Sequence, residues 1–144
     1  MRIEIPEQKK CVHAMTIPMR WGDMDAMGHM NNAVYFRFME TARIDWLTAL
    51  GYGANPQGEG VVIVNAFCNF LHQFQYPSDV HVRTFISPPG RSSFDTWTTM
   101  ERADRPGVLH STGGATVCWV DFKAQKSAPL PQSLRDLLLN VPAL

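Results

Sequence analysis

Two carboxylates, a glycine, a histidine and two asparagines lie close together in the segment WGDMDAMGHMNNAVYF, residues 21–36, which leads into a strongly apolar stretch. A carboxylate on a loop that leads into a helix can act as a nucleophile or a general base toward a substrate at the helix end. The first backbone N–H groups of a helix have no partner within it and lie at its positive end, so they can polarise a carbonyl and hold an oxyanion. The segment therefore carries groups suited to chemistry at a carbonyl carbon.

The same residues also have a simpler interpretation. Asp and Asn are common helix caps and turn residues, and Gly28 fits a turn. A single histidine such as His29 usually lies on the surface or has hydrogen-bond partners in the core, so we assign it no proton-transfer role. From the spacing alone a capped loop without chemistry is the favoured interpretation, because such caps are frequent.

The helix that this loop must enter is the clearest element of the chain. Apolar residues recur there with helical spacing, and polar residues occupy the opposite side. Asn31 or Asn32 can cap its start, and Gly51 and Gly53 can end it. We expect a helix over Asn32–Leu50, which at ~1.5 Å per residue would be about 28 Å long.

The rest of the chain is rich in β-branched and aromatic residues. Residues 1–13 are expected to be a loose lead, and a strand over Met15–Trp21 follows, in which Pro18 weakens the pattern or marks a sheet edge. After the loop GYGANPQGEG, the turn sequences QYPS, SPPG and ADRPG separate four runs with strand character. In the last run Gly113 and Gly114 predict a bulge or a bend. The four predicted strands are VVIVNAFCNF, DVHVRTFI, SSFDTWTTMER and VLHSTGGATVCWVDF.

A short helix over residues 129–139 is expected to end the chain, with Pro131 near its first turn and Ser133 as a possible cap. The order of elements predicts an α+β fold, with an antiparallel sheet of about five strands, in one domain over residues 1–144. One helix covers little of such a sheet, so we expect a homo-oligomer that hides an edge or a face.

Composition excludes several classes of function. Thirteen basic residues balance thirteen acidic ones, which argues against nucleic-acid or anionic-membrane binding. The three scattered cysteines predict no disulfide framework, and the five histidines show no metal-ligand spacing, so no metal or other cofactor is expected. The motifs GxSxG, GxGxxG, GxxxxGK[ST] and HExxH are absent. Neither a signal peptide nor a membrane-spanning run is recognisable, and we expect a cytoplasmic protein.

The segment RWGDMDAMGHMNNAVYFRFMETARIDWL, residues 20–47, resembles the corresponding segment of hotdog-fold acyl-CoA thioesterases of the 4-hydroxybenzoyl-CoA thioesterase type. GRSSF and CWVDFKAQKSAPLP resemble later stretches of that family more weakly. The resemblance implies a curved antiparallel sheet wrapped around one long helix, in dimers or dimers of dimers with sites at the subunit interface. The residues that match the family pattern D-x-D-x-x-G-H-x-N-N-x-x-Y are Asp23, Asp25, Gly28, His29, Asn31, Asn32 and Tyr35.

The resemblance also implies roles for individual residues. The family's catalytic carboxylate is the second acid of the motif and falls on Asp25, whereas Asp23 is expected to brace the loop. The oxyanion-binding N–H falls by count on Asn32, where some relatives, including those tied to the bacterial Tol-Pal envelope system, carry histidine. A histidine-assisted mechanism is therefore not expected. Ser78 is a second departure, because many members have glycine before the aspartate.

The expected function is hydrolysis of an acyl-CoA thioester to a free acid and CoA, with Asp25 as nucleophile or general base. Hydrolysis of acyl groups on acyl carrier protein and a non-catalytic acyl-CoA binding module are the alternatives. A hotdog dehydratase fits less well, because its His and acid pair has no evident counterpart. Residues predicted to bind substrate are Gly28, Asn31, Asn32, Tyr35, Arg91, Ser92 and Ser93, and those expected to line an acyl pocket are Met24, Met27, Met30 and Tyr35. For Arg91 to Ser93 an ordinary hairpin turn is an equal alternative.

Overall fold

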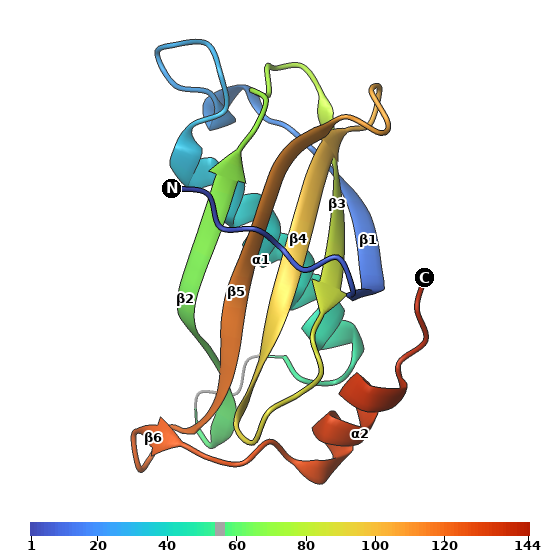
Figure 1. Ribbon diagram of the computed structural model, residues 1–144. Helices are drawn as coiled ribbons and strands as arrows, with labels where there is room; N and C mark the ends of the chain where they lie inside the picture. The colour runs from blue at the N-terminus through green and yellow to red at the C-terminus, as the bar shows by residue number, and fades with distance from the viewer. Residues whose placement is uncertain (54–56) are drawn as a thin grey trace.

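An antiparallel sheet curves around one long helix in the computed structural model, which describes residues 1–53 and 57–144 (Figure 1). The strand order is β1-β3-β4-β5-β2, and the short β6 pairs with β5. This arrangement confirms the predicted α+β class and the hotdog fold. The elements are β1 Lys10–Pro18, the short 3-10 helix Trp21–Asp23, α1 Asn32–Ala49, β2 Glu59–Phe70, β3 Asp79–Ile86, β4 Ser93–Arg102, β5 Leu109–Asp121, β6 Lys126–Ser127 and α2 Gln132–Asn140.

Helix α1 is the predicted helix, one residue shorter at its C-terminal end. Asn31 caps its start, because its Oδ1 accepts a hydrogen bond from the Ala33 N–H at 2.9 Å. Gly51 follows its end with φ of 90°, a conformation that favours glycine. The side chains that α1 buries against the sheet are Tyr35, Phe38, Met39, Ala42, Arg43, Trp46 and Leu47.

Two glycines in β5 allow the helix and the aromatic side chains to approach the sheet closely. A Cβ on Gly113 would lie 2.6 Å from Met39 Sδ, and a Cβ on Gly114 would lie 2.7 Å from Trp97 Cε3. Of the bulge or bend predicted here, the bulge is wrong, because the register is continuous at both glycines. The glycines are required by close packing, and the pairing shifts lie elsewhere, at Cys11/His13, Ile63/Asn65 and Met100/Glu101.

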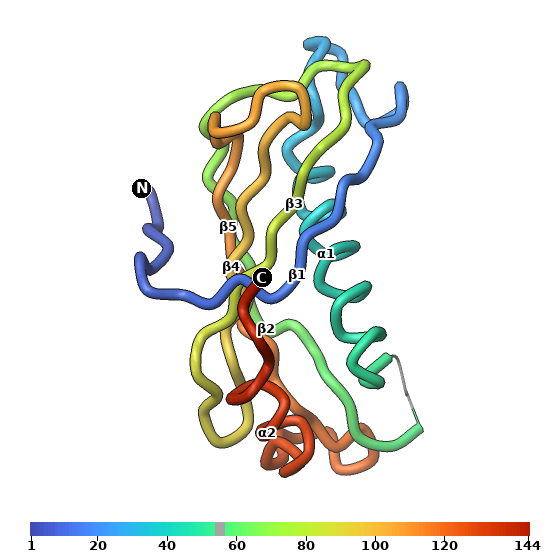
Figure 2. The backbone as a smooth tube through the Cα atoms, turned by 90° about the vertical axis from the view of Figure 1, so that its right-hand side faces the viewer, coloured from blue at the N-terminus to red at the C-terminus, as the bar shows by residue number. Residues whose placement is uncertain are grey.

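Strand β1 starts at Lys10, five residues before the predicted start, because Lys10, Cys11, His13 and Ala14 extend the pairing with β3. Pro18 ends this strand at a sheet edge, where proline removes no ladder hydrogen bond that the sheet needs. Residues 1–9, which precede β1, do not extend away from the molecule. They cross the face of the sheet opposite α1 (Figure 2), where the side chain of Asn69 donates to Ile3 O at 2.6 Å.

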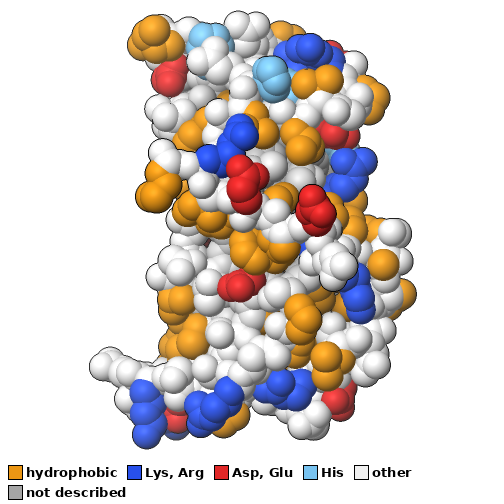
Figure 3. Space-filling view, in the orientation of Figure 1, with side chains coloured by type: hydrophobic (Ala, Val, Ile, Leu, Met, Phe, Trp, Pro, Cys, Tyr) orange, Lys and Arg blue, Asp and Glu red, His pale blue; other side chains and the backbone are white. Residues whose placement is uncertain are grey.

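The two edges of the sheet differ in what covers them. On β1, Cys11 O accepts a hydrogen bond from the Leu144 N–H at 2.9 Å, so the C-terminal tail occupies part of that edge. On β2, the other edge strand, Ile63 and Val64 are 40% and 58% exposed. Apolar side chains are visible along this edge in Figure 3. Of the two edges, β2 is therefore the one that no described segment covers.

Leu134 and Leu138 of helix α2 belong to the same buried apolar cluster as Trp46 of α1, at the lower end of the molecule. The predicted cap by Ser133 is wrong, because Pro131 holds the N-cap position and the Ser133 hydroxyl lies 2.6 Å from the Tyr52 hydroxyl. The four strands after α1 are confirmed, and β6 was not predicted. The predicted loop 51–60 includes residues 54–56, which lie outside the described residues. Within the described ranges, no helix is both long enough and apolar enough to cross a membrane.

Candidate active site

The loop before α1 is fixed by Asp23. This side chain is only 6% exposed, and its Oδ2 accepts a hydrogen bond from the Arg20 N–H at 2.7 Å. Its backbone oxygen accepts from the Asn31 N–H at 3.0 Å. Asp23 thus joins the start of the loop to the residue that caps α1.

Asp25 lies at the base of a tight turn, half-buried. Its backbone N–H donates to His29 O at 2.9 Å, and its backbone oxygen accepts from the Gly28 N–H at 3.0 Å. Gly28 has φ of 79°, which only glycine adopts readily. Asp25 Oδ1 accepts from the Met27 N–H at 2.9 Å, and no other donor in the described part of the chain reaches this carboxylate. Oδ2 therefore remains available to a substrate or a water molecule.

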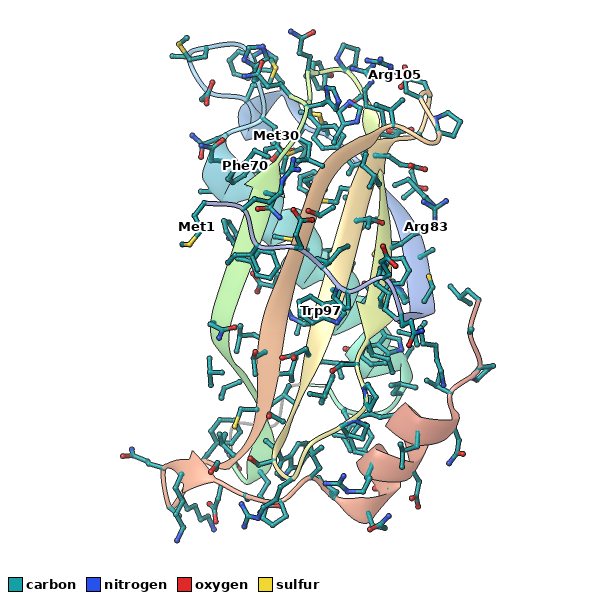
Figure 4. The ribbon with its side chains drawn as sticks, in the orientation of Figure 1. Met1, Met30, Phe70, Arg83, Trp97 and Arg105 are labelled. Atoms are coloured by element: carbon teal, nitrogen blue, oxygen red, sulfur yellow. The ribbon has the colours of Figure 1, made fainter. Side chains whose placement is uncertain are left out.

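A cavity of about 570 Å³ opens beside this turn. Its walls come from the loop that carries Asp25, from the first residues of α1, and from the chain that leaves the end of β2. Figure 4 shows Met30 and Phe70 near each other at that end of the molecule. The residues that line the cavity are Asp25, Met27, His29, Met30, Asn32, Tyr35, Phe70, Leu71, His72 and Gln73.

The start of α1 supplies a hydrogen-bond donor to the cavity. Asn31 satisfies the N–H groups of Ala33 and Val34, through Oδ1 and the backbone oxygen respectively. The Asn32 N–H makes no hydrogen bond to any described residue, and Asn32 lines the cavity. A free N–H at the positive end of a helix suits a developing oxyanion.

Tyr35 forms an apolar wall. Its ring packs edge-to-face on Phe70, with centroids 4.8 Å apart, and its hydroxyl donates to His72 O at 3.4 Å. Burial raises the pKa of the Tyr35 phenol, so it stays protonated at neutral pH and is unsuited to act as a base.

The structure separates the predicted site residues into two groups. Asp25, Asn32 and Tyr35 share the cavity, and Gly28 and Asn31 shape the adjoining loop and cap. The remaining predicted residues, Arg91, Ser92 and Ser93, lie near the other end of the sheet, beside α2 (Figure 1).

The segment from Arg91 to Ser93 is held there by its backbone. Arg91 O accepts hydrogen bonds from the Leu130 N–H and from Arg135 Nη2, and Ser92 O accepts from the Trp119 N–H at 2.7 Å. The Arg91 side chain is exposed. Within one subunit these residues do not reach the cavity that contains Asp25.

Sequence reasoning missed one wall of the cavity. Phe70, Leu71, His72 and Gln73 follow an apolar strand and carry no motif, so no local signal identified them. His29 lines the cavity, although it was assigned no role. Met24 does not line it, because its sulfur accepts a hydrogen bond from the Tyr76 N–H at 3.4 Å instead.

A family model described as the thioesterase-like superfamily matches residues 19–138, which include the whole cavity and the segment at Arg91. The chain belongs to the thioesterase-like superfamily. The predicted relationship to hotdog-fold thioesterases is thereby confirmed.

The chain is also similar to individual proteins over most of its length. The chain is 32% identical to the PA2801 protein of Pseudomonas aeruginosa, described as a putative thioesterase, over 90% of this chain and 99% of that one, with a TM-score of 0.82. It is 25% identical to the gentisyl-coenzyme A thioesterase BH1999, over 87% of this chain and 98% of that one, with a TM-score of 0.76. It is also 23% identical to the uncharacterised protein YsmA of Bacillus subtilis, over 86% of this chain and 83% of that protein.

Proposed function

We propose that the protein is an acyl-CoA thioesterase, which hydrolyses an acyl-CoA thioester to a carboxylic acid and CoA. The observation that carries this proposal is the shared cavity, which brings a half-buried carboxylate, Asp25, together with the N–H of Asn32 at the start of a helix, which is unpaired among the described residues. A base or nucleophile and an oxyanion-stabilising donor are the two groups that acyl transfer to water requires. The names of the two thioesterases described above support the same class of reaction.

Two reaction routes fit these groups. As a general base, Asp25 takes a proton from water, and the resulting hydroxide attacks the thioester carbonyl. As a nucleophile, Asp25 attacks the carbonyl itself to form an anhydride, which water then hydrolyses. In both routes the carbonyl oxygen gains negative charge, which the Asn32 N–H stabilises, and the C–S bond then breaks to release the thiolate, which is protonated to CoA.

The walls of the cavity suit an acyl group. Met27, Met30, Tyr35 and Phe70 offer apolar surface near Asp25, and they would remove apolar acyl carbons from water. An acyl group held there places its thioester carbonyl between the carboxylate and the start of α1.

We also propose that the active form is at least a dimer, formed by antiparallel pairing of β2 with β2 of a second subunit. An uncovered edge strand with exposed apolar residues favours such pairing, and β1 is partly occupied by the C-terminal tail. Antiparallel pairing places the upper end of one subunit beside the lower end of the other. Arg91, Ser92 and Ser93 of the partner subunit would then bind the CoA portion of a substrate whose acyl group lies near Asp25.

Release of free thiol from a panel of acyl-CoA thioesters tests the proposed reaction. The panel contains aliphatic and aromatic acyl groups, and the same acyl groups are presented on acyl carrier protein. We expect turnover of at least one acyl-CoA and slower turnover of the matched carrier-protein substrate. Tight binding of acyl-CoA without thiol release would identify a binding module, and preference for the carrier protein would identify the alternative hydrolase.

A further inference from the structure

Arg43, in the middle of α1, is a buried cation that no described residue neutralises by direct contact. Arg43 is only 7% exposed, and its Nε has no hydrogen-bond partner among the described residues. Burial lowers the pKa of the guanidinium, and the charge of Glu40 opposes that shift, but arginine remains charged in proteins. A buried charged donor without a partner destabilises the fold. A missing anion is therefore expected at this position.

Arg43 faces a second cavity, of about 350 Å³, between α1 and the β2 edge. The cavity is separate from the one that contains Asp25 and shares no lining residue with it. Its rim is apolar, because Phe36, Ile44 and Ile63 are 36%, 49% and 40% exposed. The complete lining is Phe36, Met39, Glu40, Arg43, Ile44, Ile63, Ala66, Thr98 and Gly114.

Among the residues that the structure describes, Glu40 is the only acidic one that lines this cavity, and it is exposed. Its one ion pair among the described residues joins it to Arg37 Nε at 3.9 Å, where both side chains are more than half exposed. Such a surface pair contributes little. The carboxylate is thus free to bind a better cation that approaches from outside the subunit.

We propose that a second copy of the chain completes this cavity: Arg43 binds Glu40 of the partner subunit, and Glu40 binds Arg43 of the partner subunit. The inference rests on the dimer proposed above and names the charged contact that holds it. In a two-fold interface every contact between two different residues occurs twice, so one axis passing between Glu40 and Arg43 produces both ion pairs.

Charge and surface complementarity favour a second copy as the occupant. The cavity offers one cation and one anion side by side, and only a surface with the same two charges in reversed order matches both. The exposed rings and methyl groups of Phe36, Ile44 and Ile63 would be covered by the same contact. The cavity also adjoins the β2 edge, so strand pairing and the ion pairs form one continuous interface.

Charge reversal tests whether the ion pairs cross between subunits. We expect Arg43→Glu and Glu40→Arg each to raise the dimer dissociation constant about tenfold or more, as measured by sedimentation equilibrium. An equimolar mixture of the two variants should form a one-to-one heterodimer, visible by native mass spectrometry. In that heterodimer each contact across the two-fold axis joins an acidic side chain to a basic one. Within each subunit, by contrast, the side chains at positions 40 and 43 carry charges of the same sign.

The mixing result separates this inference from a contact within one chain. If Arg43 and Glu40 paired within the subunit, the double variant would recover stability but the mixture would not form heterodimers. Homodimers of unchanged affinity in both single variants, or a mixture without heterodimers, would overturn the proposal.

A substitution at the exposed residue Glu40 tests the same ion pair without disturbing the core. Glu40→Gln should weaken the dimer severalfold, and the matched control Arg37→Gln, one turn away on the same helix, should leave it unchanged. Equal dimer affinity in these two variants would contradict the assignment even if Arg43→Glu failed to fold.

Failure of this inference is distinguishable from failure of the proposed function. If the wild-type enzyme is a dimer and the substitutions at Arg43 and Glu40 leave the dimer dissociation constant unchanged, only the proposed role of Arg43 is contradicted. A chain that behaves as described in the mixing experiment but releases no thiol from any acyl-CoA would contradict only the proposed reaction.

Discussion

Asp23 and Asp25 are two residues apart and differ in what their oxygens contact. Asp23 is buried and bonded to the Arg20 N–H, whereas Asp25 lines the cavity and its Oδ2 has no donor in the described chain. General-base catalysis typically contributes ~10²–10⁴-fold, so Asp25→Asn should lower kcat by at least about a hundredfold. Steady-state thiol release measures the effect, and a circular-dichroism melt checks folding. Near wild-type turnover by the folded variant would remove Asp25 from the mechanism.

The matched substitution at the neighbouring acid should act differently. Asp23→Asn keeps the shape but weakens the charge-assisted hydrogen bond to the Arg20 N–H, which typically contributes ~1.5–3 kcal/mol. We expect a lower melting temperature and a smaller loss of kcat than for Asp25→Asn. A larger kcat loss at Asp23 than at Asp25, without a change in stability, would reverse the two roles.

At the residue scale, one half of the site could be predicted from the sequence and the other could not. Asp25, Asn32 and Tyr35 lie in one short segment, and the resemblance of that segment to the family pattern predicted a shared location. Phe70 and His72 reach the same cavity only because β2 ends beside the start of α1. That proximity depends on strand order, which no local pattern in the sequence specifies.

At the scale of elements, α1 can lie close to the sheet because Gly113 of β5 has no side chain. A Cβ on Gly113 would lie 2.6 Å from Met39 Sδ and 2.7 Å from Phe67 O, and the backbone oxygen cannot move away easily. Gly113→Ala should therefore destabilise the protein by ~1–3 kcal/mol, the usual cost of overpacking. Urea unfolding measures the change. Gly22→Ala is the control, because no atom lies within 4 Å of the added Cβ, and equal effects would disprove the packing argument.

The elements themselves differ in how well the sequence predicts them. Helix α1 and strand β3 have strong local periodicity, and their predicted ranges were correct or one residue too long. Strand β1 was predicted to start too late, because its first residues become a strand only by pairing with β3. The short β6 likewise exists through its pairing with β5. Contacts between distant segments decide these boundaries.

At the scale of the whole molecule, the uncovered β2 edge predicts the mass of the particle. Light scattering at assay concentration should return twice the 16.2 kDa chain mass or a larger even multiple. A monodisperse and fully active monomer would contradict the proposed dimer, and with it any site shared between subunits.

Arg91 does not reach the Asp25 cavity of its own subunit, so a role for Arg91 in substrate binding requires a second subunit. If Arg91 of the partner subunit binds the CoA phosphates, Arg91→Ala should raise KM for acyl-CoA and leave a short N-acylcysteamine thioester unaffected. Equal losses on both substrates would indicate a folding defect instead.

Mixing variants tests the shared site directly. In heterodimers of Asp25→Asn and Arg91→Ala subunits, a shared site gathers both lesions in one cavity and leaves the other intact. With random pairing of equal amounts, half of the dimers are mixed, so about a quarter of all sites should regain wild-type kcat and KM. If Arg91 served the cavity of its own subunit, every site would contain one lesion and no wild-type turnover would return. Thiol release at low acyl-CoA concentration distinguishes the two arrangements.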